Sequence, residues 1–356
     1  MKLLAVLVFV LLSMFCHGAR LTHEENVHRL QICGKQSSPS RPTDSSHGEE
    51  SPQFKVMGGH DSGPRPHAAQ VLYTYDSLNR RTDLCAGTVI SSRHIITAAH
   101  CVYNHWALCP KSASQEIDRE DYLRNNGSAW TIVLKSRCGM MRTNETCDEE
   151  DAKIFAKPVK IFVNKQFIDA RCRKGGDIAI IELDKDYGPE LGVVPACIGS
   201  ESTVINKYTS LTAFGWGSDP RAARENDEGV FFHDILQELN MKHQKCPKDA
   251  PNDVTCTEEV ANNVCSGDSG GGLIMPASIS GRSTIIGLLS TGTSCNNMMA
   301  FPEKRQKGGY FTDARLYNGF ICKVAGICPV TRHSMKLYQN QHKVFVDEFL
   351  IAPEEE

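Results

Sequence analysis

The chain has 356 residues, with 39 basic and 42 acidic side chains, a formal net charge of −3 and 15 cysteines. A balance so near neutrality offers no basic stripe for nucleic acid, and the length is ample for one large domain with its own core. No His/Cys group has zinc-site spacing, so we expect no metal and no cofactor.

The N-terminal residues have the pattern of a signal peptide. Lys2 precedes an apolar run over 3–15, and small residues follow at Cys16 and Gly18. We therefore expect residues 1–18 to be a cleaved signal peptide and the protein to be secreted and extracellular. The run is shorter than the roughly 20 apolar residues of a membrane span, although a signal anchor is the alternative. We expect no membrane association.

The cysteine count fits export. Removal of Cys16 with the signal peptide leaves fourteen cysteines, and an even number in an exported chain predicts seven disulfides. Free cysteines are the alternative.

Residues 20–55 are hydrophilic, and 37–52 are rich in Ser, Pro and charge, which is typical of a flexible linker.

Short β-rich runs separated by turn residues follow from Val71 onward and predict an all-β sandwich or barrel. They cover 86–90, 95–98, 132–134, 178–183, 235–241 and 285–290. A helical pattern appears only late, where Leu316, Phe320, Ile321 and Val324 share one face.

Three fragments carry the chemistry. Ser269 lies in the glycine-rich run 265–271, His100 ends the run 97–100, and Asp177 opens an apolar strand. An imidazole near neutral pH can take a hydroxyl proton, and a buried carboxylate can hold that imidazole in one tautomer. The order His100, Asp177, Ser269 is that of a chymotrypsin-type triad. On these motifs the chain resembles the chymotrypsin/trypsin-like serine proteases.

The resemblance implies two packed six-stranded antiparallel β-barrels with a C-terminal helix and the active site between them. It also implies a zymogen: residues 19–55 would be a propeptide, and 56–328 the protease domain. Cleavage after Lys55 would free the Val56 ammonium to pair with Asp268. Residues 329–356 would be a C-terminal extension, either packed on the body or binding a partner.

An insert at about 104–173 departs from the family pattern. It contains two glycosylation acceptors, Asn126 and Asn144. Because glycans need exposure, we expect a disulfide-stapled surface loop.

Four family disulfides carry over by resemblance. They are Cys33–Cys197, Cys85–Cys101, Cys246–Cys256 and Cys265–Cys295, and the first would keep the propeptide attached. A further family bridge is absent at both ends, where Leu211 and Met275 stand. Six cysteines stay open to fifteen pairings, of which Cys322–Cys328 is our preferred one; the other four are Cys109, Cys138, Cys147 and Cys172.

The resemblance also assigns the substrate site. Gly267 and Ser269 would supply the oxyanion N–H groups, and Ser290 would help hold Asp177. Asn263 would form the floor of the specificity pocket between Gly292 and Gly309. An amide floor gives no counter-charge, and a buried unpaired charge costs about 2–5 kcal/mol. We therefore expect large neutral side chains rather than Lys or Arg before the scissile bond.

The sequence thus predicts a secreted serine endopeptidase acting on protein or peptide substrates. Its other expected partner is an activating trypsin-like protease, and protein inhibitors are a class that the resemblance allows. The alternative is a catalytically silent homologue that acts as a binding or regulatory module, as in secreted expansions of the family, nematode ones among them. A lipase or esterase is disfavoured because no Gly-x-Ser-x-Gly elbow occurs in the expected context.

Overall fold

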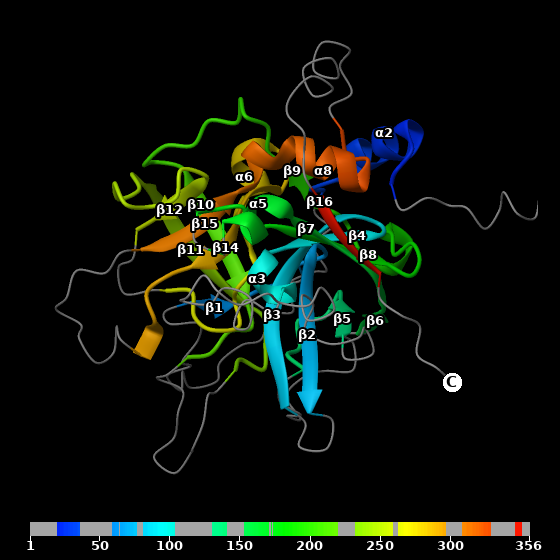
Figure 1. The fold of residues 1–356 in the computed structure, drawn as a ribbon, viewed down its shortest axis with the longest axis horizontal. Coiled ribbons are helices and arrows are strands. Elements are labelled where there is room, and N and C mark those ends of the chain that lie inside the picture. The colour runs from blue at the N-terminus through cyan, green and yellow to red at the C-terminus, as the bar shows by residue number, and fades with distance from the viewer. Residues whose placement is uncertain are drawn as a thin grey trace, which may run out of the picture.

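The structure is a computed structural model that describes part of the chain. The described residues are 20–35, 59–63, 65–76, 81–103, 130–140, 153–170, 172, 174–219, 232–258, 263–296, 308–328 and 346–350. The fold is mostly β, with two curved sheets and a few short helices (Figure 1).

The second half of the chain forms a closed six-stranded antiparallel barrel. Its strands are β10 (Ser210–Gly215), β11 (Gln237–Gln244), β12 (Val254–Thr257), β13 (Gly272–Met275), β14 (Thr284–Thr291) and β15 (Gly309–Asp313). The barrel closes because β11 pairs with both β10 and β12. Two short strands extend it: β1 (His60–Asp61) joins β11, and β9 (Cys197–Ile198) runs parallel to β14.

The first half of the chain, joined by β16 from the C-terminal extension, forms a curled half-barrel in the strand order β16-β7-β8-β4-β3-β2-β5-β6. The bounds are β2 (Ala68–Asp76), β3 (Arg81–Ser91), β4 (His94–Thr97), β5 (Trp130–Leu134), β6 (Ile154–Ala156), β7 (Pro158–Asn164), β8 (Ala179–Leu183) and β16 (Val346–Leu350). The trypsin-like fold class is confirmed, and each predicted β run overlaps a strand. Because β5, β6 and β7 fall within 104–173, that range is only partly an insert.

Branched apolar residues explain why these segments become buried strands. All five residues of β8 are buried, and four of them are apolar, with Glu182 as the exception. Leu211 and Met275, which stand where the family has a bridge, are buried in one apolar cluster. Burying each stabilises the fold by about 1.5–3 kcal/mol, against about 2–4 kcal/mol for a disulfide.

The short helices are α3 (Ala99–Val102), α5 (Lys165–Asp169), α6 (Ala277–Ser280) and α8 (Asn318–Ala325), with 3-10 turns η4 (Pro189–Leu191) and η6 (Ala314–Tyr317). The predicted C-terminal helix is α8, which buries Phe320, Ile321 and Val324. Leu316 was wrongly assigned to its buried face. It lies in η6, where the tighter turn leaves it 52% exposed.

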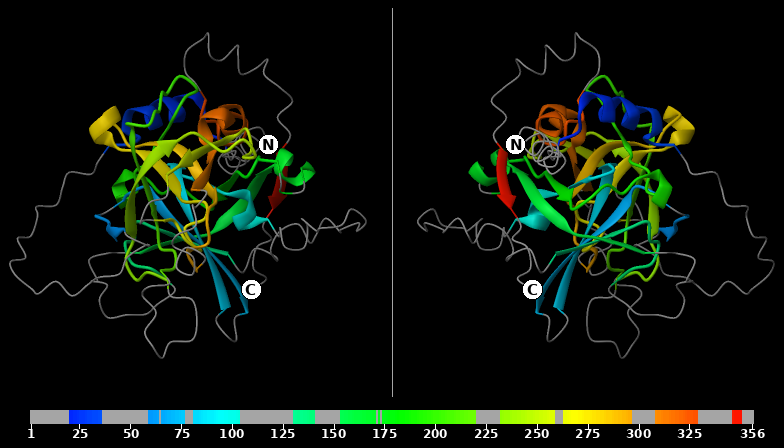
Figure 2. Two further views of the ribbon diagram at one scale, coloured as in Figure 1. Left: turned by 90° about the vertical axis from the view of Figure 1, so that its left-hand side faces the viewer. Right: turned by 90° about the vertical axis from the view of Figure 1, so that its right-hand side faces the viewer.

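The stretch 37–52, whose composition predicted a flexible linker, lies outside the described residues, whereas the hydrophilic residues 20–35 before it are folded. They contain helix α2 (His23–Ile32), whose first turn is fixed by a capping box between Thr22 and Glu25. The helix lies beside α8 in both Figure 1 and Figure 2, and the Asn26 amide donates to the Cys328 carbonyl. The sequence signal for this helix was the Thr-x-x-Glu spacing.

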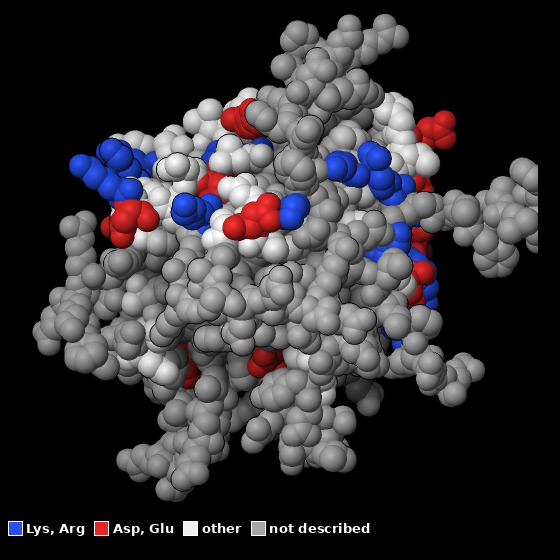
Figure 3. Space-filling view, viewed as in Figure 1, with Lys and Arg blue, Asp and Glu red and all other residues white. Residues whose placement is uncertain are grey.

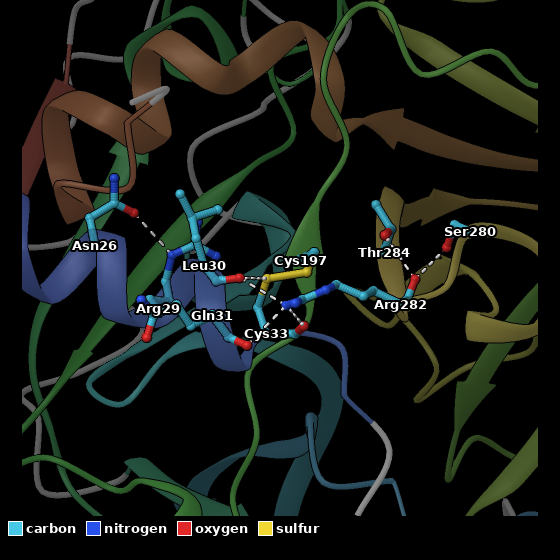
Figure 4. The surroundings of a disulfide bond; sticks show 9 residues. All are labelled: Asn26, Arg29, Leu30, Gln31, Cys33, Cys197, Ser280, Arg282 and Thr284. Atoms are coloured by element: carbon cyan, nitrogen blue, oxygen red, sulfur yellow. Dashed lines mark hydrogen bonds between the residues drawn. A yellow bond between two sulfur atoms is a disulfide. The ribbon is translucent and has the colours of Figure 1, made fainter. Parts of the chain in front are cut away.

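The C-terminal end of α2 is held in two ways (Figure 4). Cys33 forms a disulfide with Cys197. Arg282 donates to the carbonyls of Leu30 and Cys33 at 2.8 and 2.9 Å, a cation at the negative end of a helix dipole. The segment is therefore docked on the body by polar contacts as well as by a covalent bond.

Strand β16, from the C-terminal extension, pairs antiparallel with β7 and so lies on the half-barrel.

Among the helices of the described residues, none has the length and apolar character that crossing a bilayer requires. On the face shown in Figure 3, basic and acidic side chains of described residues are interspersed.

Candidate active site

His100 is placed by β4 and a disulfide. It lies in the one-turn helix α3, three positions after β4 ends at Thr97. The next residue, Cys101, is bonded to Cys85 on β3, which fixes the backbone on both sides of the turn. The two sulfurs and the His100 ring lie within 4.8 Å of one another, but the sulfurs are bonded to each other rather than being free thiolates.

Asp177 binds His100 through two hydrogen bonds. The imidazole Nδ1 lies 2.8 Å from Asp177 Oδ2, and the backbone N–H of His100 donates to Oδ1 at 2.9 Å. The Ser290 hydroxyl donates to Oδ2 at 2.6 Å. Burial alone would raise the pKa of Asp177, but the neighbouring His100 and these hydrogen bonds outweigh it and hold the pKa below its ordinary value. The carboxylate is therefore held ionised.

Ser269 is half-buried, in a loop that packs on the His100 segment. Its carbonyl accepts a hydrogen bond from the Ala86 N–H at 2.8 Å. At Gly270, with φ of +77°, a Cβ would collide with Thr97 and the Ala86 carbonyl. The structure thus brings the loop of Ser269 against the residues on either side of the Cys85–Cys101 bridge, beside the His100–Asp177 pair.

Asp268, the residue before Ser269, is buried in a cradle of backbone groups. Its two oxygens accept the N–H groups of Gly217 and Cys265 at 2.7 and 2.8 Å. A Cβ at Gly217 would lie 2.5 Å from the Asp268 carboxyl carbon, and one at Gly215 would also collide with the carboxylate. The glycines of the run 214–217 therefore make room for this side chain.

No basic side chain among the described residues partners Asp268, and burial raises its pKa to about 6 in spite of the two N–H donors. Its predicted partner Val56 lies outside the described residues, as do Lys55 and the two glycosylation acceptors, Asn126 and Asn144. The uncut chain therefore holds a carboxyl that lacks a described counter-ion.

The residues predicted to form the specificity pocket converge. The fully buried Asn263 donates through Nδ2 to the Thr293 carbonyl at 2.9 Å, next to Gly292. Gly309 packs near Val264, since a Cβ there would lie 3.7 Å from the Val264 side chain. Gly267 has φ of +100°, a conformation suited to glycine.

The structure contains the bridges Cys33–Cys197, Cys85–Cys101, Cys246–Cys256, Cys265–Cys295 and Cys322–Cys328. Cys138 and Cys172 are disulfide-bonded too, while Cys109 and Cys147 lie outside the described residues. Disulfides of this number are consistent with an oxidising, extracellular compartment.

Sequence reasoning missed two residues that contact the segment of Asp177. The Thr312 hydroxyl donates to the Asp177 carbonyl at 3.0 Å, and Asp253 accepts the N–H of the preceding Gly176 at 2.7 Å. Both come from the second barrel, and no short motif marks either one.

Comparison with known proteins agrees with this geometry. The sequence model of the trypsin family matches residues 56–304. Trypsin-like protease try-5 of Caenorhabditis elegans is 29% identical over 251 residues, which cover 67% of this chain and 76% of that protein. Chymotrypsin-C of Rattus norvegicus is 25% identical over 277 residues, covering 75% and 87%. Coagulation factor IX of Cavia porcellus is 24% identical over 257 residues, covering 68% and 74%. The chain belongs to the trypsin family and is a serine-type endopeptidase.

Proposed function

We propose that the protein is a secreted endopeptidase that cleaves peptide bonds through His100, Asp177 and Ser269 by way of an acyl-enzyme. The observation that carries the proposal is the His100–Asp177 pair, held by two hydrogen bonds beside the loop of Ser269. The alternative of a silent homologue has no observation in its favour.

The three triad residues and Gly267 take complementary roles in the proposed reaction. The Ser269 hydroxyl attacks the substrate carbonyl while His100 takes its proton and later returns it to the leaving amine. Asp177 fixes the ring tautomer and stabilises the imidazolium that forms. The N–H groups of Gly267 and Ser269 bind the developing oxyanion, and losing one such donor costs about 2.7–4 kcal/mol in the transition state.

Activation is proposed to follow cleavage after Lys55 by a trypsin-like protease. The new Val56 ammonium would then pair with Asp268 and order the loop that contains Gly267. The buried Asp268, with two N–H donors and no described cation, supports this step. Residues 19–55 would stay attached through Cys33.

The substrate is proposed to present a large neutral side chain before the scissile bond. The support is the buried amide of Asn263, which is uncharged and lies next to the segment of Gly292. Among the relatives, the name chymotrypsin-C is compatible with a non-basic preference.

A serine-directed organophosphate tests the proposal directly. After cleavage at Lys55, we expect stoichiometric labelling of Ser269, located by peptide mapping. Ser269→Ala and His100→Ala should each lower kcat by about 10⁴–10⁶, and their combination should lower it little further. Wild-type turnover by purified Ser269→Ala, or no labelling of the cleaved wild type, would refute the proposed catalytic serine.

A further inference from the structure

Asp253 lies where the second barrel meets the segment of Asp177. It immediately precedes β12, and β12 pairs with β15 so that Val254 faces Thr312. The Asp253 carbonyl accepts the N–H of Asp313 at 2.8 Å. The bridge Cys246–Cys256 ties the loop of Asp253 back to the barrel. The position of this side chain is therefore set by strand pairing and by a disulfide.

The Asp253 carboxylate binds two groups through a single oxygen. Oδ2 accepts the backbone N–H of Gly176 at 2.7 Å and the hydroxyl of Tyr317 at 2.5 Å. Tyr317 is itself buried, and burial together with the neighbouring carboxylate raises its pKa, so that its hydroxyl stays protonated as a donor. The carboxylate thus joins the residue before Asp177 to the turn that precedes α8.

Gly175 and Gly176 leave room for this contact. Both have positive φ, at +87° and +76°. A Cβ on Gly175 would collide with the Asp253 carboxylate, and a Cβ on Gly176 would lie 2.7 Å from the Phe167 nitrogen. A glycine pair is flexible by itself, so the conformation that delivers Asp177 needs an outside partner.

The backbone of Asp177 is held from both sides by the second barrel. On one side Asp253 binds the Gly176 N–H, and on the other the Thr312 hydroxyl donates to the Asp177 carbonyl at 3.0 Å. The His100 backbone N–H and Nδ1 bind the side chain between them. A shift of this backbone would therefore move the carboxylate relative to the imidazole.

We propose that Asp253 is a positioning residue for catalysis: by binding Gly176 and Tyr317 it fixes the backbone that aims Asp177 at His100. The inference rests on the proposed roles of those two residues. Asp253 acts through its hydrogen-bond geometry rather than through its charge. Because its carboxylate binds Gly176 and Tyr317 and acts through Asp177, its loss should lower kcat more than it changes KM.

Two substitutions of Asp253 distinguish an effect of its hydrogen bonds from an effect of its negative charge. In Asp253→Ala both contacts are lost, and we expect kcat to fall about tenfold or more with KM within about twofold. In Asp253→Asn the amide oxygen, placed where Oδ2 lies, can still accept both the Gly176 N–H and the Tyr317 hydroxyl. We expect this variant to keep kcat within about threefold of wild type. Asp249→Asn, which makes the same charge change at an exposed residue of the same loop, is the matched control.

A second measurement is independent of turnover. The proton between His100 Nδ1 and Asp177 gives a downfield 1H NMR signal, assigned by its absence in His100→Ala. We expect the signal to be lost or displaced in Asp253→Ala and kept in Asp253→Asn. Because this readout needs no catalysis, it tests the contact even if Ser269 fails to label.

Three outcomes would overturn the inference. They are an unchanged kcat and NMR signal in Asp253→Ala, an Asp253→Asn variant as impaired as Asp253→Ala, and an equal loss in the Asp249→Asn control. If Asp253→Ala does not fold, Tyr317→Phe decides. That variant removes one of the two donors, and a kcat lowered a few-fold at constant KM supports the proposal, whereas an unchanged kcat contradicts it.

Discussion

Asp268 should make the unfolding free energy of the uncut chain depend on pH, and the substitution Asp268→Asn should remove that dependence. Its pKa rises from the ordinary 3.8 to about 6 because of burial. At about 1.36 kcal/mol per pKa unit, ionising this group in the folded chain costs about 3 kcal/mol. The pKa of Asp268 is higher in the folded than in the unfolded chain, so the protonated carboxyl favours the folded state. This stabilisation is fully present below pH 3.8 and is lost as the pH rises through about 6.

The comparison is between wild type and Asp268→Asn, unfolded by urea with disulfides intact at several pH values between 4 and 7.5. Asparagine does not titrate, and it retains one acceptor for the N–H of Gly217 or Cys265. The lost second hydrogen bond gives an offset that does not change with pH. We expect the unfolding free energy of wild type, relative to the variant, to fall by about 3 kcal/mol over this range. Parallel curves for the two proteins would refute the reasoning.

Cleavage after Lys55 should abolish this loss. An ammonium from Val56 beside Asp268 would compensate the buried charge and lower the pKa of the carboxyl. The cleaved wild type should therefore gain stability over the uncut chain at pH 7 but not at pH 4. Cleaved protein whose Val56 amine has been carbamylated is the control, and it should behave like the uncut chain. A cleaved chain that keeps the full pH-dependent loss would contradict the proposed pairing.

Three other outcomes are expected. His67 is buried and its pKa is lowered to about 3 by burial and by Arg65, so its stabilising contribution is present above pH 6.5 and is lost towards pH 3. Relative to His67→Phe, the wild type should lose up to about 5 kcal/mol over that window in urea unfolding; an equal acid sensitivity would contradict this. After cleavage at Lys55, the segment of α2 should co-elute with the body in gel filtration even when Cys33 and Cys197 are both Ser, because polar contacts also hold it. Asn263→Asp should shift kcat/KM towards Lys and Arg substrates, and a wild type that already prefers them would show that another residue supplies the charge.

Local patterns were sufficient to predict the strands and the catalytic segments. Residues 178–181, most of them in β8, form a continuous apolar run, and Asp177 immediately precedes that run, so a short window contains both the strand and the catalytic candidate at its start. The loop of Ser269 has glycines at the positions where backbone groups approach closely. In such segments the candidate catalytic side chain and the residues that set its backbone conformation are neighbours in the sequence.

Contacts between distant segments could not be predicted in this way. Asp253 and Gly176 are 77 positions apart, and they meet because β12 pairs with β15 in one register. The pattern of apolar residues in the sequence does not determine which residues of β12 and β15 pair. The docking of α2 is similar: its capping box is local, but the Arg282 side chain that holds its end comes from a turn between two barrel strands.

The two buried aspartates of the site, Asp177 and Asp268, show that the neighbouring groups determine whether the pKa of a buried carboxyl is raised or lowered. Burial acts to raise the pKa of both. Asp177 has His100 and the Ser290 hydroxyl beside it, and its pKa is lowered, whereas Asp268 has two backbone N–H donors and its pKa is raised. Backbone dipoles alone do not offset the desolvation of a carboxylate, but an imidazole beside it does. In the uncut chain the His100–Asp177 pair is therefore already formed, whereas Asp268 has no cationic partner among the described residues. Proposed activation then needs to supply one cation to one carboxylate, which a newly freed α-ammonium can do without rebuilding either barrel.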